Sequence, residues 1–197
     1  MFTLYSADFT GNPGNCSYPH KTVVMNTDNL REAVCHDYVC AEYKNHYRNG
    51  ENFISADCLP VDCDNDHSED PKDWVTPADV LEAFPGVSIA IHYSRFNNRE
   101  KNGKPARPKF HVLFPIDRMT DATLYSDMKK LVNSIFPYFD TKALDAARFF
   151  FGTQEPNVEL YPGRMNLTEF LNDDEFDAGL PGGHKKDAVI PEGSRNA

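Results

Sequence analysis

The sequence lacks the features that mark membrane proteins and secreted proteins. None of its apolar runs approaches the roughly 20 residues of a membrane span, so we expect a soluble protein. The N-terminal stretch MFTLYSADF does not have the basic and then apolar layout of a signal peptide, which favours a cytoplasmic location. The five cysteines are an odd number and do not suggest the disulfide framework of a small secreted domain.

The sequence also has little positive charge. Its 197 residues include 20 lysines and arginines against 30 acidic residues, a formal net charge of −10, and this acidity alone argues against a nucleic-acid partner. The charge is uneven, however. Residues 57–73 contain seven acids and one base, residues 95–109 contain six bases and one acid, and residues 169–177 contain five acids and no base. The net charge therefore says little about any single surface.

The chain does contain enough apolar material for a core. Hydrophobic residues make up 40% of it and aromatic residues 12%, which excludes wholesale disorder. Composition and turn signals predict strands at residues 2–5, 21–25, 52–64 with a break at Pro60, 87–93, 109–114 and 148–151. The strands at 87–93 and 109–114 should pair as a hairpin with a long basic loop. Strands followed by helices, with hairpins among them, indicate an α+β (mixed α/β) domain.

Caps and apolar spacing predict the helices. A cap at residues 26–28 should open a helix that runs to about Arg48, because of the spacing of Leu30, Val34, Tyr38 and Ala41. Thr76-Pro77 should open a short helix that ends at Phe84. A third helix over residues 121–136, capped by Thr120, should have one apolar face formed by Leu124, Met128, Leu131 and Ile135. A short helical turn should follow at residues 141–147.

A pair of acids at the end of a predicted strand is the first candidate for chemistry. Asp62 and Asp64 alternate along the strand and should point to the same face, with Cys63 on the other. Two neighbouring carboxylates repel each other unless a cation lies between them, and oxygen ligands suit Mg²⁺ or Mn²⁺. The alternative is a solvated acidic turn without a function.

A run of bases on a later strand is the second candidate. Arg107, Lys109 and His111 should share one face, with Phe110 and Val112 on the other. Such cationic groups suit a polyphosphate, and a histidine can donate to a phosphate oxygen. The alternative is an edge strand that its charges keep soluble.

Asp140, which follows Phe139, is the third candidate. The local pattern also allows it to be the N-cap of the turn at 141–147, while Asp145 could pair with Arg148 three positions later. The cysteines are a weaker candidate. The pairs Cys35/Cys40 and Cys58/Cys63 have the wrong internal spacing for a usual zinc site, and we interpret them as buried reduced thiols.

In this order, the three candidates resemble the catalytic core of the archaeo-eukaryotic primase superfamily, and the primase-polymerases of phages, plasmids or mobile elements in particular. Asp62-Cys63-Asp64 resembles its first motif, Lys109-Phe110-His111 its second and Phe139-Asp140 its third. The resemblance covers about residues 20–160. Lys109 departs from the family, which usually has a small residue there. Asp145 competes with Asp140 for the third motif, and the spacing to Arg148 favours Asp140.

The resemblance implies a template-directed nucleotidyltransferase with an RRM-like antiparallel sheet and flanking helices. Asp62, Asp64 and Asp140 would hold two Mg²⁺ or Mn²⁺ ions, which activate the attacking 3′-hydroxyl and stabilise the leaving pyrophosphate, and no organic cofactor is implied. His111, with Arg107 and Lys109, would hold the phosphates of an NTP or dNTP. Arg148 would contact the nucleotide or support one of the acids. The template would be single-stranded DNA, and the basic loop that follows its backbone or the triphosphate would use Arg95, Arg99, Lys101 and Lys104.

The resemblance also predicts the organisation of the chain. Residues 1–162 would form the catalytic domain, and residues 163–197 an acidic, Gly-rich tail leading toward a C-terminal helical or helicase region. Such a protein would act in the cytoplasm, in a bacterial, phage or plasmid context. Two other functions use the same residues. One is a metal-dependent nuclease, and the other is a non-catalytic module that binds single-stranded nucleic acid through the basic loop and aromatic side chains.

Overall fold

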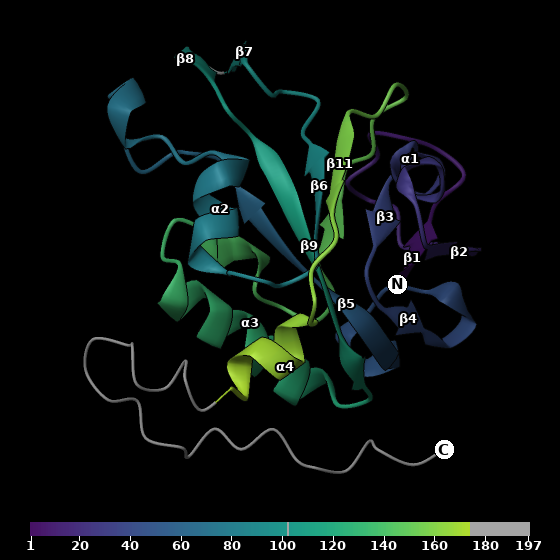
Figure 1. Cartoon of the computed structure of the whole chain (residues 1–197). Coiled ribbons are helices and arrows are strands. Elements are labelled where there is room, and N and C mark those ends of the chain that lie inside the picture. Colours follow the sequence, from purple (N-terminus) through teal and green to yellow (C-terminus); the bar gives the residue numbers. More distant parts are fainter. Residues whose placement is uncertain (102, 174–197) are drawn as a thin grey trace.

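The structure, a computed structural model, describes residues 1–101 and 103–173, which form three layers (Figure 1). The central layer is a five-stranded antiparallel sheet in the order β11-β6-β9-β5-β4. Its strands are β4 (Glu42–Tyr43), β5 (Phe53–Cys63), β6 (Ile89–Tyr93), β9 (Phe110–Met119) and β11 (Val158–Tyr161). The mixed α/β class is confirmed, and so is the pairing of the two strands around the basic loop, which are β6 and β9.

Three helices cover one face of the central sheet. They are α2 (Pro77–Ala83), α3 (Ala122–Ile135) and α4 (Leu167–Leu171). The strand residues in the core on this side are Val61, Cys63, Phe110, Val112 and Phe114, alternate positions of β5 and β9. Helix α4 lies beyond residue 162, where the catalytic domain was expected to end, and its Leu167 and Phe170 belong to this core. The remainder of the expected tail, residues 174–197, lies outside the described residues.

A second, smaller sheet and helix α1 (Thr27–Val34) cover the other face (Figure 1). The small sheet has the order β10-β3-β1-β2, with strands β1 (Phe2–Ser6), β2 (His20–Val24), β3 (Tyr38–Val39) and β10 (Phe149–Phe150). Its core contains Cys58, Ala90 and Leu113 of the central sheet. Because side chains alternate along a strand, Asp62 and His111 also face this second layer.

The predicted helix up to Arg48 is wrong. Helix α1 is capped by the side chain of Asn26, as expected, but it ends at Val34, and Tyr38 lies in strand β3. The chain turns at Asp37, whose buried carboxylate accepts hydrogen bonds from the backbone of Gly11, Asn12 and Gly152. These partners are distant in the sequence, so local periodicity could not show them. Cys35 and Cys40 therefore do not share a helix.

Two further expectations need correction. Strand β5 does not break at Pro60, which pairs with Leu113 of β9. Among the described residues, β9 is the one strand that pairs with β5 at Pro60. A proline at this position therefore breaks no hydrogen bonds to a second neighbouring strand. Helix α3 is capped by Asp121 instead of Thr120, and its buried face is displaced by about one position, to Tyr125, Met128, Lys129 and Val132.

The basic loop between β6 and β9 contains its own small hairpin, which projects from one end of the central sheet (Figure 1). Its strands are β7 (Arg99–Lys101) and β8 (Lys104–Arg107). In the part of the chain that the structure describes, no helix has the length and apolar character needed to cross a membrane.

Candidate active site

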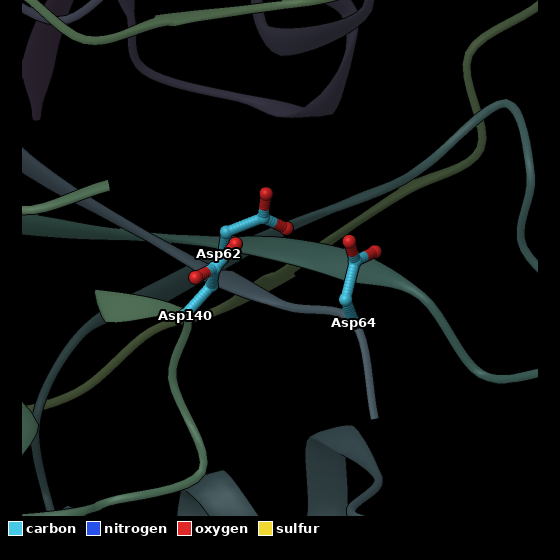
Figure 2. Close-up of side chains that lie close together, drawn as sticks. All are labelled: Asp62, Asp64 and Asp140. Atoms are coloured by element: carbon cyan, nitrogen blue, oxygen red, sulfur yellow. The ribbon is translucent and has the colours of Figure 1, made fainter. Parts of the chain in front are cut away.

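Three carboxylates meet where strand β5 ends. Asp62 is near the end of β5 and Asp64 follows it, so the two side chains project from the same side of the strand. Asp140 comes from the loop after α3, and its backbone N–H donates a 2.7 Å hydrogen bond to the carbonyl of Asp62. One carboxylate oxygen from each aspartate lies within 4.8 Å of the others, and Figure 2 shows the three side chains grouped at the strand end. The structure thus brings together the three acids that the sequence singled out.

The charge of Asp62 is poorly stabilised by its surroundings. Its Oδ1 atom is buried and has no hydrogen-bond partner among the described residues. Burial, and then the charge of Asp64, raise the pKa of Asp62 to about 7. A buried carboxylate oxygen without a partner, beside two other carboxylates, is a donor set that suits Mg²⁺ or Mn²⁺. These residues therefore fit a divalent cation.

Asp64, in contrast, has a cation beside it already. The Lys109 ammonium lies 3.0 Å from Asp64 Oδ1, donates to the Asp64 carbonyl at 2.9 Å and lies 3.5 Å from Asp66 Oδ1. The lysine side chain is only 6% exposed. Its nitrogen therefore holds the loop after β5 in place, and Asp64 is a carboxylate whose charge is partly balanced.

His111 lies beside Asp62 on the neighbouring strand. The two residues are register partners between β5 and β9, and His111 Nε2 is 3.7 Å from Asp62 Oδ1. Burial lowers the pKa of His111 to about 4, so its ring is neutral at physiological pH. On the other side, His111 Nδ1 contacts the Tyr38 hydroxyl at 3.2 Å and His92 Nδ1 at 3.3 Å.

Tyr38 and His92 are residues of this site that the sequence did not single out. His92 is the register partner of His111 on β6, so Asp62, His111 and His92 form a row across three strands. The signal available in the sequence was a histidine at an alternating position between apolar residues of a predicted strand. No such signal existed for Tyr38, which was assigned to a helix.

Arg148 supplies a positive charge beside Asp62. Its Nη2 is 3.9 Å from Asp62 Oδ2, and its guanidinium lies over the ring of Phe150. The Nε atom of Arg148 is buried and lacks a hydrogen-bond partner within the described ranges. Asp145 does not join the cluster, because its carboxylate accepts from the backbone N–H of Ala147. Asp140 also caps the turn Thr141–Ala143, so the alternative local role predicted for it exists beside its place in the cluster.

Arg107 is directed at the loop after β5 and not at the three carboxylates. Its side chain is fully buried, with its guanidinium donating to the carbonyl of Asn65 at 2.7 Å and to Glu69 at 2.8 Å. The same group lies over the ring of Trp74. Arg107 therefore fastens the loop after β5, and its donors are directed at that loop.

The four bases of the hairpin segment have different surroundings. The Arg95 guanidinium stacks over Phe151 at 4.2 Å and also lies near Phe96, whose ring the Lys101 ammonium approaches at 4.6 Å. Lys104 pairs with Asp66 at 3.3 Å. Arg99 is exposed on β7. Arg95 and Lys101 are thus half-buried beside aromatic rings, whereas Arg99 and Lys104 are exposed.

The cysteines do not contribute to a cluster of metal ligands. Within the described ranges, the single close group of three or more acidic, histidine or cysteine ligands is formed by Asp62, Asp64 and Asp140. Cys40, Cys58 and Cys63 are buried, whereas Cys16 and Cys35 are half-buried.

Comparison of the sequence with protein-family models gives no match, and comparison with curated proteins gives none. Among solved structures, the chain is similar to the AEP domain of the cyanophage S-2L primase-polymerase (PrimPol). The TM-score is 0.46 and the sequence identity 13%, over 82% of this chain and 81% of that chain. At this level of similarity the function has to be argued from the side chains of the site.

Proposed function

We propose that this chain is a template-directed nucleotidyltransferase, the catalytic domain of a DNA primase-polymerase. One observation carries the proposal. Three carboxylates from separate segments meet within 4.8 Å, and the most buried of them, Asp62, has an oxygen without a partner among the described residues. The arrangement leaves a place for a divalent cation, and phosphoryl transfer depends mainly on such charge neutralisation and on positioning.

Asp62, Asp64 and Asp140 are the residues that would hold the metal, which we propose to be two Mg²⁺ or Mn²⁺ ions without an organic cofactor. When bound, such ions activate the attacking 3′-hydroxyl and stabilise the negative charge of the leaving pyrophosphate. The sheet contributes the rigidity of the site, because Asp62 lies on a strand paired with β9 and Asp140 is tied to it by a backbone hydrogen bond.

The triphosphate of an incoming NTP or dNTP would lie against Arg148 and His111. A buried Nε atom of Arg148 without a partner among the described side chains supports this role, because a guanidinium is suited to a phosphate. Arg107 has no part in this proposal, since its donors already bind the loop after β5. Lys109 acts here by holding Asp64, which replaces the phosphate contact expected for it from the sequence.

The template would be a single strand of DNA that passes along the basic hairpin. Arg95, Arg99, Lys101 and Lys104 would contact its backbone, while the rings of Phe96 and Phe151 offer stacking surfaces for bases. We extend the proposal to a helical or helicase region that follows the domain in the complete protein. Such an enzyme would act in the cytoplasm of a bacterial or phage-infected cell.

The test is primer synthesis on single-stranded DNA with NTPs or dNTPs and Mn²⁺ or Mg²⁺. We expect product from the unmodified protein and none from Asp62→Ala/Asp64→Ala. Equal product from both proteins would refute the proposal. Cleavage of the DNA without added nucleotide would indicate a nuclease, and DNA binding that persists without metal-dependent nucleotide binding would indicate a non-catalytic module.

A further inference from the structure

The segment between α3 and β10 contains both Asp140 and Arg148, yet it has little regular structure. Its helical part is the short turn Thr141–Ala143. Buried backbone carbonyls that are not paired in a helix or a sheet need other hydrogen-bond donors. In this segment, side chains from other parts of the chain supply them.

The backbone before Arg148 is held at three consecutive carbonyls, each of which accepts from a different side chain. The three bonds run from Lys129 Nζ to the Asp145 carbonyl at 2.8 Å, from the Tyr43 hydroxyl to the Ala146 carbonyl at 2.7 Å and from Arg48 Nη1 to the Ala147 carbonyl at 3.0 Å. Lys129 belongs to α3 and Tyr43 to β4, and both side chains are buried. The backbone that leads into Arg148 is therefore fixed from two separate elements of the fold.

The backbone around Asp140 has anchors of its own. Asn133 Nδ2 of α3 donates to the Phe139 carbonyl at 2.9 Å, and the Asp140 N–H donates to the Asp62 carbonyl at 2.7 Å. Neither bond involves the side chains that hold the carbonyls before Arg148. The two ends of the segment are thus fixed independently.

The buried lysine shows that these contacts do more than fill space. Lys129 shares the buried face of α3 with Met128 and Val132, where an apolar side chain would pack without losing hydration. Burial lowers the pKa of Lys129 to about 8, so the protein interior opposes its charge. Retention of an ammonium at this cost indicates a need for its donor, which the Asp145 carbonyl accepts.

We propose that these donors are positioning residues with two separate tasks. Lys129 and Tyr43 hold the backbone that places Arg148. Asn133 holds the backbone that places Asp140. The inference rests on the proposed function, in which Arg148 meets the triphosphate of a nucleotide and Asp140 binds a divalent cation. Displacement of a positioned group by about 1 Å can have a large effect on its action, so loss of one anchor should be measurable.

Tyr43→Phe tests the anchors before Arg148, because it removes one donor and keeps the ring. We expect the Kd for dATP, measured by calorimetry with Mn²⁺ in excess, to rise several-fold, while the Mn²⁺ affinity without nucleotide stays that of the unmodified protein. Lys129→Met should repeat this result from another element. Tyr125→Phe is the matched control, since it removes another buried hydroxyl, which donates to the Cys58 carbonyl at 2.7 Å, and it should change neither affinity.

Asn133→Ala tests the anchor before Asp140 and should lower the Mn²⁺ affinity several-fold. An unchanged Mn²⁺ affinity in this variant, an equal loss in Tyr43→Phe, or a change of dATP affinity in Tyr125→Phe as large as in Tyr43→Phe would overturn the proposal. The expected results without primer synthesis would reject the proposed function and leave the positioning roles standing. Absence of dATP binding by the unmodified protein would refute the proposed function together with the task of Tyr43, and the Mn²⁺ comparison would still decide the task of Asn133.

Discussion

Strand β5 has one aspartate in its middle, Asp57, and one near its end, Asp62, and the two have opposite surroundings. Asp57 accepts a 2.7 Å hydrogen bond from the backbone N–H of Thr3 and a 2.8 Å bond from its hydroxyl. Asp62 is more deeply buried, and one of its oxygens has no partner among the described residues. The first carboxylate joins strand β1 to the central sheet, whereas the second is held in an environment that opposes its charge.

The difference supports a structural role for Asp57 and the functional role that we propose for Asp62. A buried charge without compensation costs free energy, and proteins retain such groups where function requires them. Asp62 is also next to two acids, Asp64 and Asp140, which adds repulsion that a bound cation would relieve. The same residue type therefore stabilises the fold in the middle of the strand and, near its end, lies in the cluster that we propose to bind a cation.

The largest expected effect is the loss of metal binding in Asp62→Asn. Changes around metal ligands alone weaken binding by about 10-fold to 100-fold, so removal of a ligand should lower Mn²⁺ affinity by at least about 100-fold. Isothermal titration calorimetry with Mn²⁺ measures this, and primer synthesis should fall with it. Asp57→Asn is the matched control and should bind Mn²⁺ like the unmodified protein. Equal affinities in all three proteins would remove the distinction between the two acids.

The next effect concerns the pH dependence of stability without metal. Because the pKa of Asp62 rises on folding to about 7, the native state binds more protons than the unfolded state between about pH 4 and pH 7. The free energy of unfolding should therefore decrease as pH rises through this range. Asp62→Asn lacks the penalty and should be more stable than the unmodified protein at pH 8, by up to about 4 kcal/mol.

Urea unfolding at pH 4 and pH 8 in the presence of a chelator measures this difference. The two proteins should have similar stability at pH 4 and diverge at pH 8. A variant that is less stable than the unmodified protein at pH 8 would show that Asp62 contributes to the fold as Asp57 does.

Asp57→Asn should have the opposite sign. The carboxylate accepts two hydrogen bonds from Thr3, and hydrogen bonds to a charged group contribute about 1.5 to 3 kcal/mol. An amide can accept only one of them, so we expect a loss of about 1.5 kcal/mol in urea unfolding at pH 8. A neutral effect of this substitution would mean that strand β1 does not depend on Asp57.

How much of this could be predicted from the sequence differs between the site and its surroundings. Alternation along a strand predicted that Asp62 and Asp64 share a face, whereas Asp140 was joined to them by the resemblance of the three motifs to the primase superfamily. The lack of a hydrogen-bond partner for Asp62 Oδ1 could not be predicted from the sequence, since it depends on how the two sheets pack. Nor could the burial of Arg107, the last residue of β8, because its partners are in the loop of residues 65–69.

The wrong prediction of a helix up to Arg48 has the same origin, because it too depends on contacts between distant parts of the chain. The spacing of Leu30, Val34 and Tyr38 satisfies a helix, but the chain turns at Asp37 because distant backbone N–H groups bind its carboxylate. That error also concealed Tyr38, which contacts His111 in the candidate site as part of a strand. Long-range hydrogen bonds overrode the local pattern at Asp37.

The smallest expected effect comes from the lysine beside Asp64. Lys109→Met removes the buried ammonium 3.0 Å from Asp64 Oδ1 and should make the cluster more attractive to a cation. Removal of this competing positive charge should raise Mn²⁺ affinity in calorimetry several-fold. Lys104→Met is the matched control, because it removes the same charge from a pair with Asp66 outside the cluster and should leave the affinity unchanged. If both variants change Mn²⁺ affinity equally, the net charge of the region controls binding, and the contrast between a balanced Asp64 and an unbalanced Asp62 has no functional consequence.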